Sequence, residues 1–242
     1  METLFVSDLH LDSSRPEATA AFLRFLASAA HDADTLYILG DLFEYWVGDD
    51  DPNPHHRKII AALAELTSSG TRCFAMHGNR DFMLGERFAT ETGVVLLHDP
   101  TLIYVEGCTV LISHGDLLCT DDVSYQRFRK IARSPWLQRV INALPLGIRH
   151  RLAATTRQRS AVAYEHKAEA ILDVNQLAVE KWLQEYQTHI ILHGHTHRPA
   201  VHEFEVAQHA YKRIVLGDWY TQGSVLRWDN DGPELAVVNF QS

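Results

Sequence analysis

The chain has 242 residues, of which 46% are hydrophobic and 22% are charged, and its net charge is −9. This composition is typical of a globular protein with a sizeable core. No apolar run approaches the roughly 18 residues of a membrane-spanning helix, and the strand-like run 4–6 starts too close to Met1 for a signal peptide. We therefore expect an intracellular protein, folded as one domain over residues 1–242 with an insertion.

Apolar, strand-like runs alternate with helical patterns through the first half of the chain. Strands are expected at 4–7, 36–39, 73–76, 102–105, 109–113 and 189–192, and helices from Pro16 and over about 54–67. The runs are uniformly apolar, as in strands that helices cover on both faces. Beyond Ala200, further runs at 201–206, 213–216, 225–227 and 235–238 alternate with Gly, Asp and Asn, which indicates antiparallel strands. The pattern predicts an α/β fold with one mixed sheet layer and helices outside.

Positive charge is concentrated between Asp121 and Lys167. This span holds ten Lys and Arg residues and three acidic residues, a local net charge of +7, and the rest of the chain carries −16. A basic block in an acidic protein indicates a local anionic partner, either a phosphorylated substrate, an acidic membrane surface or nucleic acid. A solvated helical surface is the alternative.

The basic block is expected to form a helical insertion over about 121–167. Ser134 and Pro135 are typical of a helix N-cap and first turn. The residues that follow place an apolar stripe on one face until the helix breaks at Pro145 and Gly147; they are Trp136, Leu137, Val140, Ile141 and Leu144. Core packing, a lipid-binding surface and a groove for a partner helix all fit such a stripe. The excess of arginine favours a cap over the functional site.

Five short polar motifs each follow an apolar run. They are Asp8-Leu9-His10, Gly40-Asp41, Gly78-Asn79-Arg80-Asp81, His114-Gly115-Asp116 and Gly194-His195-Thr196-His197. Loops at strand ends converge on one edge of a sheet, where α/β folds bind ligands. Imidazole, carboxylate and amide oxygen without a thiolate suit Mn(II), Fe(II) or Zn(II) better than a structural zinc. The set predicts a hydrolase in which two cations about 3.5–4 Å apart activate water for attack on phosphorus.

Cysteine and the remaining histidines suggest no second site. Cys73, Cys108 and Cys119 lack metal-type spacing and are expected to be reduced thiols. Histidines in polar stretches are expected at the surface; they are His31, His55, His56, His150 and His209.

In this order and over essentially the whole chain, the five motifs resemble the calcineurin-like metallophosphoesterase superfamily. Within it, the motif wording at 7–11, 40–46, 77–82, 113–116 and 194–199 is similar to the branch that hydrolyses UDP-2,3-diacylglucosamine in lipid A biosynthesis. The resemblance implies a four-layer α/β/β/α sandwich with a helical cap insertion. It also implies cleavage of the substrate's pyrophosphate to UMP and 2,3-diacylglucosamine 1-phosphate.

The resemblance further implies a ligand set and a substrate site. One manganese ion would be bound by Asp8, His10, Asp41 and His197, and a second by Asp41, Asn79, His114 and His195, with Asp41 bridging. Substrate contacts would come from Asn79, Arg80, Asp122, Ser160, Lys167 and His195, and from Tyr164 at a position where relatives are expected to carry Asn. We assign catalytic roles to Asp41, Arg80 and His114.

Arg80 departs from the wider superfamily, in which many phosphomonoesterases carry His after the Gly-Asn pair. A UMP leaving group is a far weaker base than an alkoxide and needs little protonation. A permanently charged guanidinium is then more useful on phosphate oxygens than a proton donor. We expect Arg80 to stabilise charge.

Three other functions fit the sequence less well. A metal-dependent nucleotide pyrophosphatase or phosphodiesterase of the same fold would not need the apolar cap, and a non-catalytic interaction module would not need the full ligand set. A nuclease would carry aromatic stacking residues where this block is aliphatic. We therefore expect no nucleic-acid partner and no obligate protein partner. The amphipathic basic insertion predicts a peripheral protein on the anionic cytoplasmic side of the inner membrane.

Overall fold

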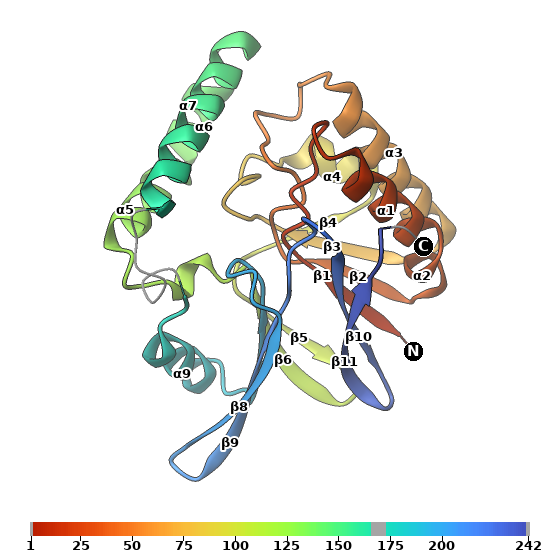
Figure 1. The fold of residues 1–242 in the computed structure, drawn as a ribbon, viewed down its shortest axis with the longest axis vertical. Coiled ribbons are helices and arrows are strands. Elements are labelled where there is room, and N and C mark those ends of the chain that lie inside the picture. The colour runs from red at the N-terminus through yellow and green to blue at the C-terminus, as the bar shows by residue number, and fades with distance from the viewer. Residues whose placement is uncertain (1, 166–172, 241–242) are drawn as a thin grey trace.

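A computed structural model describes residues 2–165 and 173–240 of the chain, and the strands form two sheets (Figure 1). The first has the order β11-β10-β1-β2-β3-β4 and the second the order β5-β6-β7-β9-β8. The strands of the first sheet are β1 (Thr3–Val6), β2 (Thr35–Ile38), β3 (Arg72–Met76), β4 (Val95–Leu97), β10 (Gly223–Asp229) and β11 (Gly232–Val238). Those of the second sheet are β5 (Thr101–Val105), β6 (Cys108–Ser113), β7 (Ile190–His193), β8 (Ala200–Val206) and β9 (His209–Val215).

The helices fall into two groups by their place in the chain. Those between the strands of the first sheet are α1 (Pro16–Ala27), α2 (Ala29–Asp32), α3 (Pro54–Ser69) and α4 (Glu86–Thr92). A short 3-10 turn, η1 (Asp116–Leu118), is followed by α5 (Val123–Ala132), α6 (Pro135–Asn142), α7 (Leu146–Glu165) and α9 (Gln176–Glu185), all between β6 and β7.

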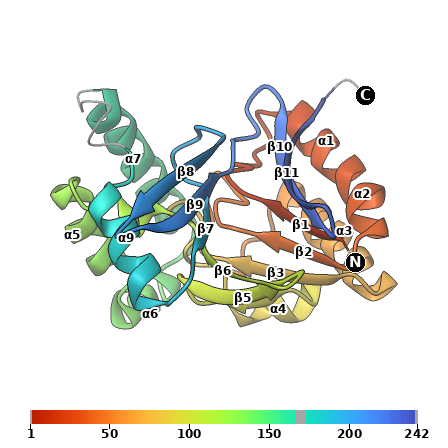
Figure 2. The ribbon, with the colours of Figure 1, turned by 90° about the horizontal axis from the view of Figure 1, so that it is seen from below.

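Three apolar cores separate four layers, which Figure 2 shows from one side to the other. The first core packs β1 to β3 against α1 and α3, through residues such as Leu36, Phe22 and Ile59. The second lies between the two sheets and includes Phe5 and Ile112, and the third joins Ile191 of β7 to Leu183 of α9. The layer order is therefore helix, sheet, sheet, helix, which confirms the expected sandwich. The single sheet layer inferred from the strand pattern is wrong, because apolar periodicity does not reveal how strands divide between sheets.

Every expected strand is present, but several elements were not predicted. They include β4, α4 and α9, each short or weakly patterned. In the first sheet β1 to β4 are parallel and β10 is antiparallel to β1. In the second sheet β6, β7 and β9 are parallel, while β5 and β8 are antiparallel edge strands. The carboxyl ends of β1, β2, β3, β6 and β7 consequently lie at one end of the sandwich.

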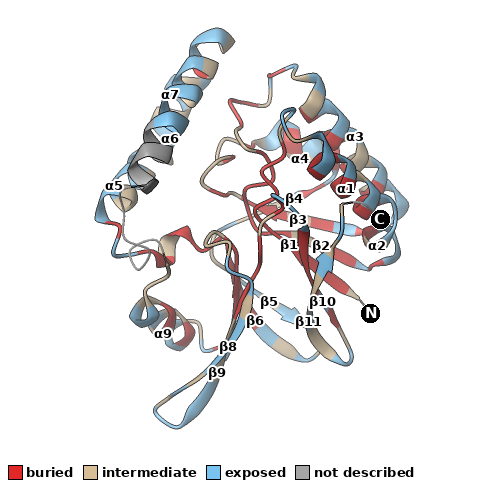
Figure 3. Ribbon diagram, viewed as in Figure 1, coloured by how far each residue is buried: buried red, intermediate tan, exposed pale blue. Residues whose placement is uncertain are grey.

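The insertion is helical, as expected, and its helix α6 starts at Pro135 after the N-cap Ser134. The Ser134 hydroxyl does not cap α6, however, and donates to the Ile131 carbonyl oxygen instead. Every residue of α6 is described and none is buried, with Trp136 64% exposed. Core packing of this helix, one of the expected alternatives, is therefore wrong. Figure 3 shows the described part of α7 as largely exposed, beside the sandwich.

Among the residues of α6 and α7 whose side chains are described, Arg149 is the exception, since its side chain is only 3% exposed. Its guanidinium Nη1 donates to the Val47 carbonyl oxygen and to Asp50 Oδ1, both at 2.7 Å, and Nη2 pairs with the second oxygen of the same carboxylate. This two-pronged ion pair fixes the start of α7 to the loop before α3. Among the described residues, no helix is long and apolar enough to cross a bilayer.

The histidine and cysteine expectations hold with one correction. His56 is 1% exposed rather than at the surface, because it lies on the face of α3 that also buries Ile59 and Leu63. Its ring packs on Phe43 and Trp46, and burial lowers the pKa of His56 to about 4. The three cysteines are all described and form no disulfide.

Candidate metal centre

The predicted ligand residues lie on five loops that leave the carboxyl ends of β1, β2, β3, β6 and β7. Backbone hydrogen bonds join these loops within each sheet, from Asp8 N to the Gly40 carbonyl oxygen at 3.1 Å and from Gly194 N to that of His114 at 2.9 Å. A bond between the sheets runs from His195 N to Asp8 Oδ2 at 2.8 Å. The loops therefore form one connected surface at this end of the sandwich.

One cluster gathers Asp8, His10 and His197. His10 Nε2 lies 3.3 Å from His197 Nε2, and His197 Nε2 lies 3.3 Å from Asp8 Oδ1. Asp41 Oδ2 is 3.7 Å from His10 Nε2. Asp8 Oδ1 is buried and has no hydrogen-bond partner among the described residues, an arrangement that needs an explanation such as a bound ion. Converging imidazole nitrogens around an unpartnered carboxylate oxygen fit a divalent cation.

A second cluster gathers Asn79, His114 and His195. Asn79 Oδ1 lies 3.0 Å from His114 Nε2 and 2.9 Å from His195 Nδ1. Asp41 Oδ2 is 3.8 Å from His114 Nε2, so this one oxygen lies between the two clusters. The structure thus brings together all seven residues expected to bind metal, with Asp41 in the central position.

The backbone at these positions is unusual. Five of the seven residues have positive φ: Asp8 (55°), His10 (48°), Asp41 (53°), His195 (69°) and His197 (56°). The left-handed region costs a non-glycine residue roughly 1–2 kcal/mol. Such residues concentrate at functional sites, where the surrounding structure holds them in place. Here the strain turns successive ligand side chains toward a common point.

Glycines allow the loops to approach this closely. A Cβ atom on Gly78 would overlap the carboxylate and amide nitrogen of Asp41, and one on Gly194 would overlap the side chains of Ser7 and Asp8. Gly40 has a φ of +89°, and its Cβ would meet His114 Nδ1 at 2.6 Å. Gly40, Gly78 and Gly194, which precede Asp41, Asn79 and His195, are therefore each required by packing around the ligand of a neighbouring loop.

Three acceptors that the sequence did not single out face the outer nitrogens of the histidines. Glu44 Oε2 lies 3.2 Å from His10 Nδ1, and Asp218 Oδ2 lies 3.4 Å from His197 Nδ1. The Leu39 carbonyl oxygen accepts from His114 Nδ1 at 2.9 Å. Such partners fix the ring orientation and tautomer of a metal-binding histidine. Glu44 follows Asp41 by three residues, but nothing in the sequence separates it from other acidic residues.

The pKa values of the histidines at this centre differ sharply. Burial disfavours a charged His114, but the carboxylates of Asp41 and Asp8 outweigh it and raise the pKa of His114 to about 9. Burial and the neighbouring His114 instead lower the pKa of His195 to about 4. Burial opposes ionisation of Asp8, yet the nearby charge of His197 holds the pKa of Asp8 well below the ordinary range. The centre is strongly anionic and therefore suited to cations.

Two carboxylates of the motifs form hydrogen bonds that hold the ligand loops and the insertion in place. Asp81 is buried and accepts from the backbone N–H groups of Gly78 and Leu42, both at 2.8 Å, which locks two ligand loops together. Asp116 is also buried and accepts from the Tyr125 hydroxyl at 2.5 Å and from Arg129 Nε at 2.7 Å. Through Asp116, helix α5 is attached beside the metal centre.

The expected substrate residues have varied surroundings. The Arg80 amide N–H donates to Asp41 Oδ1 at 2.7 Å, while its buried Nε has no partner among the described residues. Asp122 caps α5 by accepting from Tyr125 N at 3.0 Å and from Ser124 Oγ at 2.8 Å. Ser160 and Tyr164 lie in α7, but their side chains are outside the described part of the structure. Lys167 lies outside the described residues altogether.

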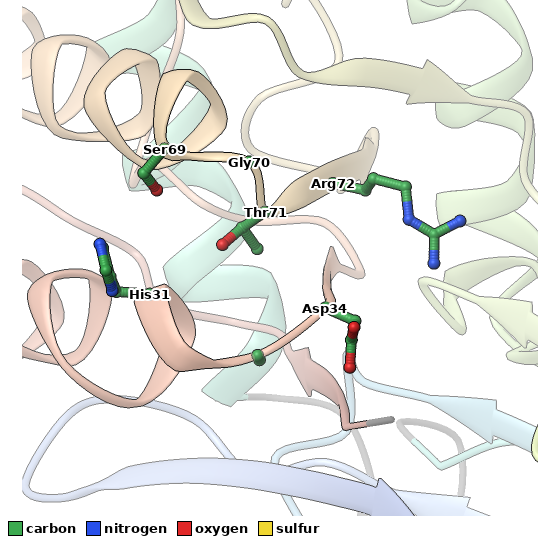
Figure 4. A pocket seen from close by; sticks show the side chains of 7 residues that line it. His31, Asp34, Ser69, Gly70, Thr71 and Arg72 are labelled. Carbon is green, nitrogen blue, oxygen red and sulfur yellow. The ribbon is translucent and has the colours of Figure 1, made fainter.

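A separate surface hollow lies at the amino-terminal ends of β2 and β3, away from the ligand loops. Figure 4 shows its polar lining, which includes His31, Asp34 and Arg72. Asp34 accepts from the Glu2 amide N–H and Arg72 donates to the Thr35 hydroxyl. These two side chains therefore stabilise the ends of the strands. The hollow contains none of the residues predicted to be functional.

Comparison with known proteins supports the family that the motifs predict. Residues 1–199 match the family described as calcineurin-like phosphoesterase. Proteins named UDP-2,3-diacylglucosamine hydrolase from Escherichia coli K12 and Escherichia coli O7:K1 are 53% and 52% identical to this chain. Each alignment covers 99% of this chain and 100% of the relative. Among solved structures, the Escherichia coli phosphoesterase Yfce has a TM-score of 0.49 and 17% identity, and covers 99% of this chain and 93% of its own.

Proposed function

This chain belongs to the calcineurin-like phosphoesterase family and is a metal-dependent hydrolase, and we propose that its substrate is UDP-2,3-diacylglucosamine. The proposed reaction cleaves the pyrophosphate bond and yields UMP and 2,3-diacylglucosamine 1-phosphate. The observation that carries the proposal is the gathering of six ligand-type side chains in two clusters around Asp41, in a chain 52–53% identical to hydrolases named for this substrate.

The two clusters supply a ligand set for each of two cations. The first would use Asp8, His10, Asp41 and His197, and the second Asp41, Asn79, His114 and His195. When bound, two divalent cations would activate a water molecule for attack on phosphorus and neutralise the phosphoryl oxygens. We propose manganese because the family resemblance implies it, and nitrogen and oxygen donors without a thiolate are compatible with Mn(II) as they are with Fe(II) and Zn(II).

The chain's own residues would position and stabilise the phosphates. The Arg80 amide N–H holds one oxygen of Asp41, which leaves Asp41 Oδ2 directed between the clusters. The Arg80 guanidinium has an unpartnered Nε and remains charged at any physiological pH. We propose that it binds phosphate oxygens as negative charge develops there. Arg80→His should then lower the rate on the pyrophosphate, and a fully active variant would contradict this role.

The insertion would contact the membrane in which a diacylated substrate lies. Trp136, Val140 and Ile148 are exposed on α6 and α7, near the exposed cations Arg139 and Arg151. We propose that this surface docks reversibly on the anionic inner leaflet. Arg149, which the basic pattern grouped with this surface, is buried and structural.

Vesicle flotation tests the membrane proposal. Replacing Trp136, Val140 and Ile148 together by Ser should reduce flotation on anionic vesicles, while replacing the similarly exposed Tyr104 of β5 by Ser should not. Undiminished flotation of the triple variant would remove the insertion from membrane binding.

Hydrolysis in oxygen-18 water tests the reaction itself. Turnover of UDP-2,3-diacylglucosamine should exceed that of dinucleoside polyphosphates and cyclic nucleotides. The label should appear in UMP if water attacks the uridine-side phosphorus. Preferential turnover of the soluble nucleotides would instead identify a nucleotide pyrophosphatase or phosphodiesterase.

A further inference from the structure

A pocket of about 210 Å³ lies beside the loop that carries His195 and His197. Its lining includes Thr196, from between the two histidines, and Arg213 and Val215 from β9. Ile214 belongs to the core between the sheets, so its neighbours Arg213 and Val215 point to the opposite face of the second sheet. The pocket therefore opens on the outer side of that sheet while sharing a loop with the metal centre.

Unpartnered polar atoms mark this pocket as they mark the metal centre. Among the described residues, buried polar atoms without a hydrogen-bond partner include Asp8 Oδ1 and Arg80 Nε at the proposed catalytic site. They also include Thr196 Oγ1 and Arg213 Nε, both from residues that line this pocket. The Arg213 side chain is only 11% exposed. Buried donors are normally paired in native proteins, so water or a bound ligand is needed to pair these two groups.

The lining has the chemistry of a site for a small heterocycle. Arg213 and the Thr196 hydroxyl can donate hydrogen bonds. Asp173 already accepts from Val174 N at 2.7 Å and from Arg198 Nη1 at 3.4 Å, and its carboxylate lone pairs can accept one more. Arg213 Nη1 approaches Asp173 Oδ1 only to 3.9 Å, too far for a hydrogen bond. Pro199 and Val215 add apolar walls. A pyrimidine-2,4-dione carries two carbonyl acceptors and one ring N–H donor, which complements this set.

We propose that this pocket binds the uracil ring of the nucleotide, with Arg213 and Thr196 donating to the ring carbonyl oxygens and Asp173 accepting the ring N–H. The inference rests on the proposed function, because it assumes a UDP-linked substrate. It assigns the two ends of that substrate to different regions, with the base beside β9 and the acyl chains at the exposed helices of the insertion. The phosphates would lie between them, at the loops that meet around Asp41.

Binding of nucleotides to the manganese-loaded protein tests this assignment. By calorimetry, the wild type should bind UMP more tightly than ribose 5-phosphate or CMP, whose ring nitrogen has no hydrogen to offer Asp173. Arg213→Met should weaken UMP binding about tenfold or more, since a good buried contact of this kind is commonly worth that factor. Binding of ribose 5-phosphate and of 2,3-diacylglucosamine 1-phosphate should stay unchanged, which also shows that the variant is folded.

Two further variants keep the test decisive. Thr196→Val removes one donor without touching the ion pairs, and should also weaken UMP selectively if Arg213→Met fails to fold. Arg227→Met, an exposed cation on β10 that pairs with Glu2, should leave UMP binding unchanged. Equal UMP affinity in wild type and both pocket variants, or no preference of the wild type for UMP over ribose 5-phosphate, would show a pocket that holds only water.

Hydrolysis by the same preparations separates the two hypotheses. If the wild type cleaves UDP-2,3-diacylglucosamine and Arg213→Met raises KM without lowering kcat, the proposed function and the uracil assignment are both supported. If the wild type cleaves it and the pocket variants keep its KM, only the uracil assignment fails. If the wild type does not cleave it, the proposed function itself fails.

Discussion

The ligand loops and the helical insertion are built in opposite ways. The loops are buried, tied to one another by backbone hydrogen bonds, and held in left-handed conformations that glycine neighbours make possible. The insertion is largely exposed, and charged contacts such as Arg149–Asp50, Arg157–Glu44 and Arg129–Asp116 attach it to the rest of the protein. The contrast suggests that the sandwich fixes the geometry of catalysis, while a loosely packed element adapts to the lipid part of the substrate.

The largest effect should come from the centre of the ligand loops. Asp41→Asn removes the charge of the oxygen that lies between the two clusters. We expect hydrolysis to fall on the order of 10³-fold or more, because a cation contributes several kcal/mol of charge stabilisation. Metal content of the purified protein, measured alongside kcat, should fall as well. Asp231→Asn, in the exposed turn after β10, is the matched control, and wild-type rates in Asp41→Asn would refute the two-cation proposal.

Glu44 connects the two regions, because it contacts His10 on one side and Arg157 of α7 on the other. Glu44→Gln should weaken manganese affinity about 10–100-fold, the usual cost of losing a carboxylate behind a metal-binding histidine. Manganese titration followed by electron paramagnetic resonance would measure this. Arg157→Gln keeps Glu44 in place and should leave the affinity near that of the wild type. An unchanged affinity in Glu44→Gln would show that His10 does not depend on this partner.

A smaller effect is expected where the insertion is anchored. Arg149→Met leaves Asp50 without its partner, but Asp50 is more than half exposed and can be solvated, so the cost is well below that of a fully buried pair. We expect KM for the acylated substrate to rise about tenfold, with manganese affinity unchanged. Lys58→Met, an exposed cation on α3 outside the insertion, should change neither quantity. A loss of metal affinity in Arg149→Met would mean that the two regions are not independent.

The smallest effect concerns the pH dependence of the metal-free protein. The folded-state pKa of His114 is raised from 6.5 to about 9, so its protonated form stabilises the fold below pH 6.5. That contribution is lost as pH rises through about 9. With chelator present, Tm should be a few degrees lower at pH 9.5 than at pH 6.5. The same measurement on His114→Asn should show a weaker dependence, whereas an equal or rising Tm in the wild type would contradict the assignment.

The sequence predicted the ligand residues well because each motif combines a strand end with a polar side chain, both of which are local features. It could not reveal Glu44 or Asp218 as partners of the ligand histidines, because their roles depend on which loops meet in space. The surface assignment of His56 failed for a related reason. Its polar neighbours concealed its place on the apolar face of α3, which becomes visible only when the spacing to Ile59 and Leu63 is followed. The buried role of Arg149 likewise required knowing that α7 passes beside Asp50.

The left-handed conformations of Asp8, His10, Asp41, His195 and His197 have a consequence for engineering. Glycine at any of these positions would relieve the backbone, and a selection for heat resistance alone would favour it. Each such substitution would remove a candidate ligand. Every gain in thermal stability would therefore lower turnover. Efforts to stabilise this enzyme should therefore leave these five positions unchanged and act on exposed positions of α1 and α3, which lie outside both the ligand loops and the insertion.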